Sequence, residues 1–149
     1  MSKAPGIPYA TTRLVRDHCL CLHAQRAARA LARRFDEALQ PIGLTNGQFS
    51  LMMSLNRPNP PAMGAVATFL AMDRTTLTAA LKPLERRGLV KQAADPDDRR
   101  RRLVTLTADG RSVLARAVPV WERTHAEIDG LLAEGSAKNL RQDLRALAT

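Results

Sequence analysis

The chain has 149 residues, which is enough for one domain with its own core, and its 45% hydrophobic and 25% charged residues are ordinary for a soluble globular protein. No apolar run approaches the ~20 residues of a membrane-spanning helix, the first residues lack the apolar region of a signal peptide, and two cysteines cannot form the disulfide framework of a small secreted protein. We therefore expect a cytoplasmic protein without a membrane partner, and the net charge of +9 indicates a polyanionic partner.

After a start rich in proline and glycine, the N-terminal part has the pattern of one long amphipathic helix. The side chains of its apolar face recur at alternating spacings of three and four: Leu14, His18, Cys21, Gln25, Ala28, Ala32, Phe35 and Leu39. This helix is predicted to end near Pro41 to Gly43. Thr45 and Gln48 then predict a capping box for a helix over residues 46–55, and three prolines predict a loop over residues 56–61.

The next stretch predicts two helices joined by a tight connection, as in a helix-turn-helix. Residues 62–71 form the first, Met72 and Asp73 connect them, and Asp73 is a good N-cap for a second helix that ends before Gly88. The second helix has an apolar face formed by Leu77, Ala80, Leu81 and Leu84. Its polar face suits the base edges and phosphates of a major groove and comprises Arg74, Thr75, Thr76, Thr78 and Lys82. Pro83 lies inside the helix and predicts a bend.

A β-hairpin with a basic tip is predicted after this helix. Residues 89–91 and 103–106 have strand character, and Asp95 with Pro96 predicts the turn. Four consecutive arginines, Arg99 to Arg102, follow that turn, and grouping them is costly unless a polyanion is near. We therefore interpret the hairpin as a DNA-binding wing, and a solvated basic loop without a partner is the alternative.

The rest of the chain is predicted to be helical. Thr107 caps a long helix with a kink at Pro119, and its apolar stripe comprises Leu114, Val118, Trp121, His125, Ile128 and Leu132. A last helix follows, with Leu140, Leu144 and Leu147 on one side. The terminal helices carry more apolar surface than one small winged core can cover, so we expect a second copy of the chain to cover it.

Five motifs occur in an order and at a spacing specific to one protein family. They are Gly43-Leu44-Thr45 with Gln48 and Phe49, Asp73-Arg74-Thr75-Thr76-Leu77-Thr78, Leu84-Glu85-Arg86-Arg87-Gly88-Leu89-Val90, Asp95-Pro96-Asp97-Asp98-Arg99-Arg100, and Leu106-Thr107 with Gly110-Arg111. In these motifs the chain resembles, over nearly its whole length, the MarR family of bacterial transcription regulators. The resemblance implies a mainly α-helical fold with a small β-hairpin wing and one domain over residues 1–149, with a winged helix-turn-helix at 45–107 and dimerisation helices at 10–42 and 108–149.

The resemblance also implies a homodimeric repressor of an inverted-repeat operator, with recognition helices in successive major grooves and an arginine of each wing in a minor groove. Arg100 matches that wing arginine and Asp98 the aspartate that orients the wing. Arg99, Arg101 and Arg102 are interpreted as phosphate contacts or spares. A non-specific architectural DNA-binding protein and a winged helix that binds only protein are the alternatives.

We expect the signal to be a small molecule bound between the dimer helices and the winged helix. The expected lining comprises Arg16, His18, Cys19, Cys21, Phe49, Met52, Met53 and Trp121. Cationic side chains among them suit a carboxylate and the aromatic ones a ring, although each residue taken singly is also explained as core or surface.

Thiol-based sensing of organic hydroperoxide is the alternative signal. Two positions apart on a helix, Cys19 and Cys21 point to opposite sides, which excludes a mutual disulfide without unwinding. Counted back from Thr45, Cys21 matches the peroxidatic cysteine of the family's hydroperoxide-sensing branch, and Arg16 or His18 can lower its pKa. The tyrosines of that branch are replaced by Gln25, Phe35 and Asn46. The bland alternative is that the cysteines are small core residues, and a metal held by Cys and His between subunits is a further one.

An enzyme is not expected. His18, His23 and His125 are possible bases and Cys21 a possible nucleophile, but the sequence has no nucleophile elbow, no glycine-rich phosphate loop and no His-x-x-x-His pair. We therefore expect no catalytic residues, no cofactor and no bound metal.

Overall fold

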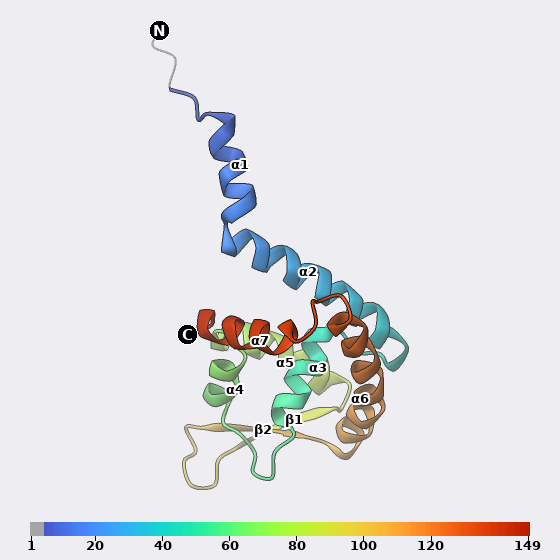
Figure 1. Cartoon of the computed structure of the whole chain (residues 1–149). Coiled ribbons are helices and arrows are strands. Elements are labelled where there is room, and N and C mark those ends of the chain that lie inside the picture. Colours follow the sequence, from blue (N-terminus) through green and yellow to red (C-terminus); the bar gives the residue numbers. More distant parts are fainter. Residues whose placement is uncertain (1–4) are drawn as a thin grey trace. The chain divides into compact units, whose positions relative to one another are not determined.

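The structure, a computed structural model, describes residues 5–149 (Figure 1). The first four residues, on which part of the signal-peptide prediction depends, lie outside this range. The chain divides into two compact units, and the boundary between them in the sequence lies between Arg34 and Phe35. Each unit is mainly α-helical, and the second also contains a two-stranded hairpin, which confirms the predicted fold class.

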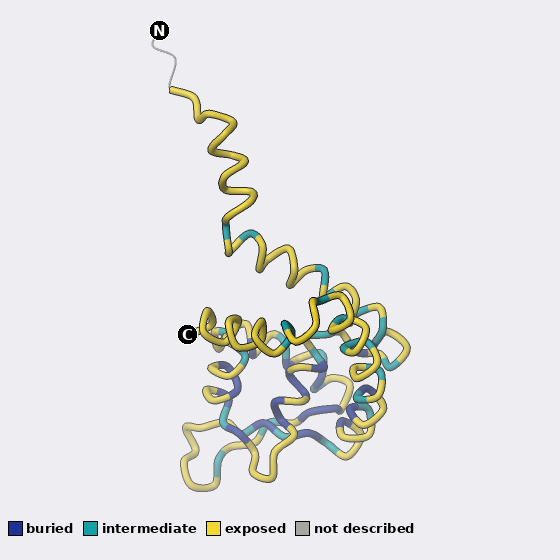
Figure 2. The backbone as a smooth tube through the Cα atoms, viewed as in Figure 1, coloured by how far each residue is buried: buried dark blue, intermediate teal, exposed yellow. Residues whose placement is uncertain are grey.

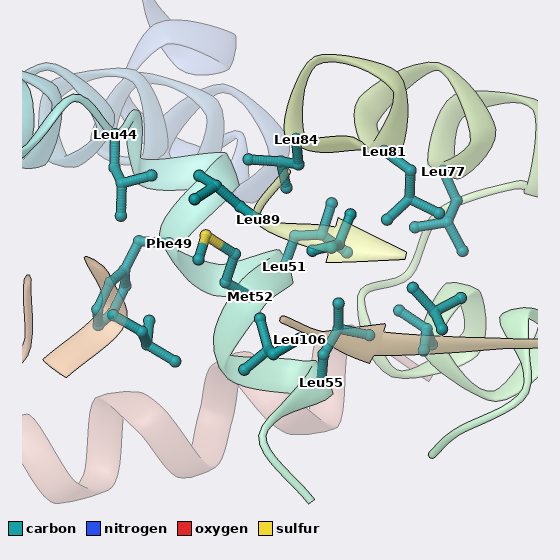
Figure 3. Close-up of a cluster of buried hydrophobic side chains, with 14 of the residues drawn as sticks. Leu44, Phe49, Leu51, Met52, Leu55, Leu77, Leu81, Leu84, Leu89 and Leu106 are labelled. Carbon is teal, nitrogen blue, oxygen red and sulfur yellow. The ribbon is translucent and has the colours of Figure 1, made fainter. Parts of the chain in front are cut away.

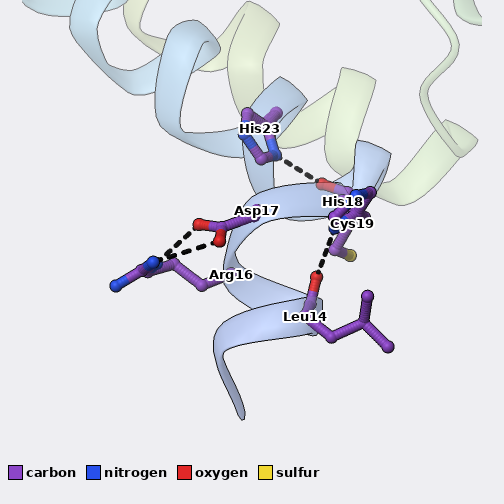
Figure 4. A network of polar contacts seen from close by, with 6 residues as sticks. All are labelled: Leu14, Arg16, Asp17, His18, Cys19 and His23. Atoms are coloured by element: carbon purple, nitrogen blue, oxygen red, sulfur yellow. Dashed lines mark hydrogen bonds and ion pairs between the residues drawn. The ribbon is translucent and has the colours of Figure 1, made fainter. Parts of the chain in front are cut away.

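The prediction of one unbroken N-terminal helix is wrong at Cys19. Helix α1 spans Tyr9–His18 and α2 spans Leu20–Leu39, and the backbone of Cys19 between them is extended, with φ −72° and ψ 109°. No proline or glycine is present at the break. Side chains instead hydrogen-bond the backbone there. The rings of His18 and His23 contact the carbonyls of Leu14 and Cys19 through Nδ1 at 3.1 and 2.8 Å (Figure 4). The Leu22 amide also donates to Cys19 Sγ at 3.4 Å. These bonds offset part of the cost of interrupting the helix.

The second unit begins at the end of α2, which a short 3-10 helix, η1 (Gln40–Ile42), closes before Gly43 at φ 81°. Helix α3 (Asn46–Leu55) has the predicted capping box, formed by Thr45 and Gln48. Asp36 of α2 accepts hydrogen bonds from the backbone and side-chain amides of Asn46, at 2.7 and 2.9 Å. These bonds lower the pKa of Asp36 and attach the end of α2 to the start of α3.

Helices α4 (Met63–Phe69) and α5 (Arg74–Arg86) form the predicted helix-turn-helix. α4 is shorter than predicted, because Ala62 is its N-cap and the chain turns at Ala71, whose φ of 54° is uncommon for a residue with a side chain. The N-cap of α5 is confirmed: Asp73 Oδ1 accepts from the Thr76 amide at 2.7 Å. This bond lowers the pKa of Asp73.

Strands β1 (Val90–Ala94) and β2 (Arg102–Leu106) form the predicted antiparallel hairpin, with Val90 opposite Leu106 and Ala94 opposite Arg102. The outer edge of β2 is held by the segment before α4, because the Val104 amide donates to the carbonyl of Pro61 at 3.1 Å. Helix α6 (Ala108–Asp129) follows with the predicted Thr107 cap, and α7 (Ser136–Leu147) ends the chain.

The core of the second unit lies where α3, α5, the hairpin and α6 meet (Figure 2). Figure 3 shows leucines from α3, α5 and the hairpin around Met52. Met52 is fully buried, so its prediction as an effector contact is wrong: at this position α3 faces the core. The apolar face predicted for α5 is confirmed, since Leu77, Leu81 and Leu84 are fully buried.

One close contact joins the end of α5 to the start of α6. The Thr107 amide donates to the carbonyl of Leu89 at 3.0 Å, and the Thr107 hydroxyl donates to the carbonyl of Gly88 at 2.6 Å while accepting from the Gly110 amide at 3.0 Å. A Cβ placed on Gly110 would lie 2.0 Å from the Leu89 carbonyl oxygen. Only glycine therefore fits at this point of α6.

We expect Gly110→Ala to lower the free energy of unfolding by about 3 kcal/mol, because backbone atoms must move to admit the methyl group. Urea unfolding at a fixed protein concentration measures this. Gly47→Ala is the matched control: Gly47 is also in the first turn of a helix, but a Cβ there has no atom within 4 Å. An unchanged urea midpoint for Gly110→Ala would show that the contact is absent.

Candidate nucleic-acid interface

The exposed face of α5 carries the side chains predicted to meet DNA. Arg74, Thr75, Thr76, Thr78 and Lys82 are all exposed, whereas Leu77, Leu81 and Leu84 of the same helix are buried. The Thr78 hydroxyl donates to the carbonyl of Arg74 at 2.8 Å, so this threonine presents its methyl group and oxygen lone pairs rather than a free donor.

The helix continues past Pro83 to Arg86. Pro83 therefore does not end α5, and the predicted bend stays a prediction.

Aspartates organise the hairpin tip. Asp95 accepts from the Asp97 amide at 2.9 Å, and Asp98 accepts from the Arg100 amide at 3.1 Å. These bonds fix the backbone from which the arginines project, and the role of Asp98 in orienting the wing stays a prediction. Among the described residues the only ion pair of the four tip arginines joins Arg101 to Asp95, at 3.9 Å.

The four arginine side chains, Arg99 to Arg102, are exposed. The hairpin that carries them is attached to α5, because the Gln92 amide of β1 donates to the Glu85 carboxylate. The tip and the polar face of α5 therefore belong to one structural unit of exposed donors and positive charge.

A second candidate site is an apolar cavity of about 590 Å³ beside α3, α4 and α6. Phe49 and Trp121 line it with nearly parallel rings, 6.2 Å between centroids and 19° between planes. Met53, also predicted, lies in the same wall. Three of the predicted effector residues are thus brought together.

Sequence reasoning missed the other residues that line this cavity, and two of them, Arg57 and Phe69, have side chains that could contact a ligand. The Arg57 guanidinium lies 5.9 Å from the centre of the Phe69 ring, and its Nε donates to the carbonyl of Ser54 at 2.9 Å. The Phe69 side chain is 69% exposed, which is unusual for phenylalanine. A lone arginine in a proline-rich loop and an aromatic residue at a helix end were the available signals.

Four other predicted effector residues, Arg16, His18, Cys19 and Cys21, belong to the first unit. Figure 4 shows the first three of them. Arg16 pairs with Asp17 at 2.6 Å, and this raises the pKa of Arg16. Cys19 is partly buried and Cys21 is exposed, and both are free thiols. The prediction that both lie on one continuous helix is wrong, since the helix is interrupted at Cys19, so the argument from helical rotation does not apply to them.

Within residues 5–149, His, Cys, Asp and Glu side chains form no group of three able to hold a metal ion. No helix in this part of the chain combines the length and apolar character of a membrane span.

Comparisons with known proteins agree with the motifs. The MarR family model matches residues 44–101. The transcriptional regulator HosA of Escherichia coli is 35% identical over 106 residues, which cover 70% of this chain and 77% of HosA. The transcriptional regulator MosR of Mycobacterium tuberculosis, solved in complex with DNA, is 37% identical and has a TM-score of 0.80, covering 88% of this chain and 94% of MosR.

A third similar protein is BpsR of Bordetella bronchiseptica, whose DNA binding is regulated by 6-hydroxynicotinic acid. It is 27% identical with a TM-score of 0.79, covering 88% of this chain and 94% of BpsR. HosA and MosR are transcriptional regulators and not enzymes, in agreement with the expected absence of catalysis. The resemblance seen in the sequence is confirmed: the chain belongs to the MarR family of transcriptional regulators.

Proposed function

We propose that this regulator is a sequence-specific DNA-binding repressor, with α5 in a major groove and Arg100 of the hairpin in the adjacent minor groove. The observation that carries the proposal is the joining of the exposed polar face of α5 to a hairpin tip with four exposed arginines. Unpaired guanidinium groups suit phosphates and narrow grooves, and threonines suit base edges. The DNA complex of MosR supports this use of the same fold. A role on chromosomal DNA implies the cytoplasm.

We propose further that two copies bind an inverted repeat. Exposed leucines on α7, Leu140, Leu144 and Leu147, and exposed apolar residues of α1, such as Leu14 and Val15, support an interface between copies. The dimerisation helices in this proposal lie at 10–42 and 108–149, and the winged helix at 45–107. Both winged helices must meet the duplex in register, so a small change in their separation weakens binding.

The apolar cavity is the proposed effector site. Stacked Phe49 and Trp121 suit an aromatic ring, and Arg57 at the edge suits a carboxylate. The control of BpsR by 6-hydroxynicotinic acid, an aromatic carboxylic acid, supports an effector of this class. Binding beside α3, α4 and α6 would shift the winged helix and release the operator.

The DNA proposal predicts different effects for two substitutions. Arg100→Ala should weaken operator binding by roughly 1–3 kcal/mol, since a minor-groove contact is lost. Thr76→Ala should lower affinity for the operator but not for a scrambled duplex, since it removes a base contact. Gel shifts of the chain on its own upstream intergenic DNA, over a range of salt concentrations, measure both.

Arg116→Ala is the control. Arg116 is exposed on α6, outside the α5 and hairpin residues of this interface, and its substitution removes the same single positive charge as Arg100→Ala. Unchanged affinity of Arg100→Ala would overturn the wing assignment. Equal affinity and salt dependence of the wild-type protein on both duplexes would favour a non-specific architectural protein instead.

The effector proposal can be tested by fluorescence, because Trp121 is the only tryptophan in the chain and lines the cavity. Hydroxybenzoates and hydroxynicotinates should quench its emission and release the operator. Arg57→Gln should weaken binding of such a carboxylate about tenfold, through loss of a charge-assisted hydrogen bond, but barely affect the corresponding neutral amide. Equal effects on acid and amide would contradict the role of Arg57.

A thiol sensor is the second candidate, favoured by the exposed Cys21, whose Sγ accepts a hydrogen bond from the Gln25 amide at 3.3 Å. Organic hydroperoxide would convert this thiol to a sulfenic acid and release an alcohol. Hydroperoxide should then abolish operator binding by the wild type and by Cys19→Ser but not by Cys21→Ser, and added thiol should restore it. Binding that is indifferent to the oxidant would exclude this candidate.

A further inference from the structure

A small basic cleft of about 240 Å³ separates the start of α4 from the hairpin. Four consecutive uncharged residues line one part of it: Ala62, Met63, Gly64 and Ala65. The other side carries four guanidinium groups, from Arg74 of α5 and from Arg100, Arg101 and Arg102 of the hairpin. We call this concavity the arginine cleft. Arg102 was interpreted above only as a phosphate contact or a spare, without a defined site.

The charge of the arginine cleft is largely uncompensated. Among the described residues, only Arg101 has an ion pair, with Asp95 at 3.9 Å, and no carboxylate lines the cleft. Four like charges converging from two elements repel one another, and an anion between them relieves this repulsion. The planar donor forks of guanidinium groups match the oxygens of a phosphate, and the small side chains opposite leave room for it.

The position of the cleft points to the source of that anion. It opens between the first residue of α5 and the hairpin tip, the two elements proposed to enter a major and a minor groove. Adjacent major and minor grooves of a duplex are separated by one sugar-phosphate backbone. A protein that reaches into both grooves must therefore place the intervening backbone against the surface between its two reading elements.

We propose that the arginine cleft holds one backbone phosphate of DNA, shared by Arg74 and Arg102 across it. This inference rests on the proposed DNA-binding function and gives Arg102 a defined partner, Arg74, at one phosphate. The shared phosphate would fix the angle between hairpin and α5 on the duplex without reading sequence. Its effect is therefore expected to be the same on operator and scrambled DNA.

The salt dependence of binding tests the proposal. Neutralising one phosphate contributes roughly 0.9 to the slope of log K against log salt, or about fivefold in affinity at 0.15 M salt. Arg74→Gln with Arg102→Gln should lower the slope by roughly 0.9 in total, on operator and scrambled duplexes alike. A loss of roughly 1.8 would mean two separate phosphates, and no loss would mean none. Either result overturns the shared site.

A glycine pair provides a test that leaves every arginine in place. Gly64 lines the cleft with no atom within 4 Å of an added Cβ, so Gly64→Glu introduces a carboxylate that competes with the phosphate. Gly47→Glu is the matched control: Gly47 is likewise the second residue of its helix, likewise open, and outside the cleft. Gly64→Glu should lower the salt slope by at least roughly 0.9 relative to Gly47→Glu. Equal slopes would contradict the proposal.

The outcomes separate this inference from the function on which it rests. If the wild type does not distinguish operator from scrambled DNA, the proposed sequence specificity fails, while the slope differences still test the cleft on either duplex. A last experiment measures the binding of inorganic phosphate to the protein by phosphorus NMR. Phosphate line broadening that Gly64→Glu abolishes, together with unchanged DNA slopes, would assign the cleft to a free anion and overturn the proposal.

Discussion

The contact between Gly110 and the Leu89 carbonyl determines how the parts of the second unit are joined. Thr107 completes it, since its backbone and hydroxyl bond the last two residues before β1 and cap α6 at the same time. These contacts consequently bring together the end of α5, the start of β1, the end of β2 and the first turn of α6. A side chain on Gly110 would separate them, so the orientation of the hairpin relative to α5 depends on a residue that lies in neither.

This joint also connects the two candidate sites. Val118 and Trp121 on α6 line the apolar cavity, about three to four turns from the cap that holds the hairpin. α6 is one continuous helix between them, with Pro119 inside it, and a displacement of the cavity wall would be carried along the helix to its first turn. An aromatic ligand beside Trp121 would therefore act on the joint directly. The proposed release of DNA needs no rearrangement of the core residues around Met52.

Most of the fold is predictable because its signals are local. The capping box of Thr45 and Gln48, the Asp73 cap and the hairpin turn each depend on residues within a few positions, and the structure has all three. The break at Cys19 could not be predicted, because no proline or glycine marks it in the sequence. It depends on hydrogen bonds between side chains and backbone, which the spacing of apolar residues does not reveal. Part of the cavity lining was missed for a different reason: Arg57 joins Phe49, Met53 and Trp121 only when α3, α4 and α6 pack together.

The proposed DNA contacts depend on residues close together in the sequence, whereas the proposed effector site depends on residues that only the packing of helices brings together. At the hairpin tip Asp98 accepts from the Arg100 amide, and only Arg101 pairs with an aspartate, so the guanidinium groups of Arg99, Arg100 and Arg102 are left for phosphate. That arrangement is encoded within a few consecutive residues. The lining of the cavity comes from three helices, and partly exposed positions such as Phe69 support no cap or core contact of the winged helix. Substitutions there can change the preferred ligand while leaving the DNA-binding surface intact, so effector specificity is the property least constrained by this fold.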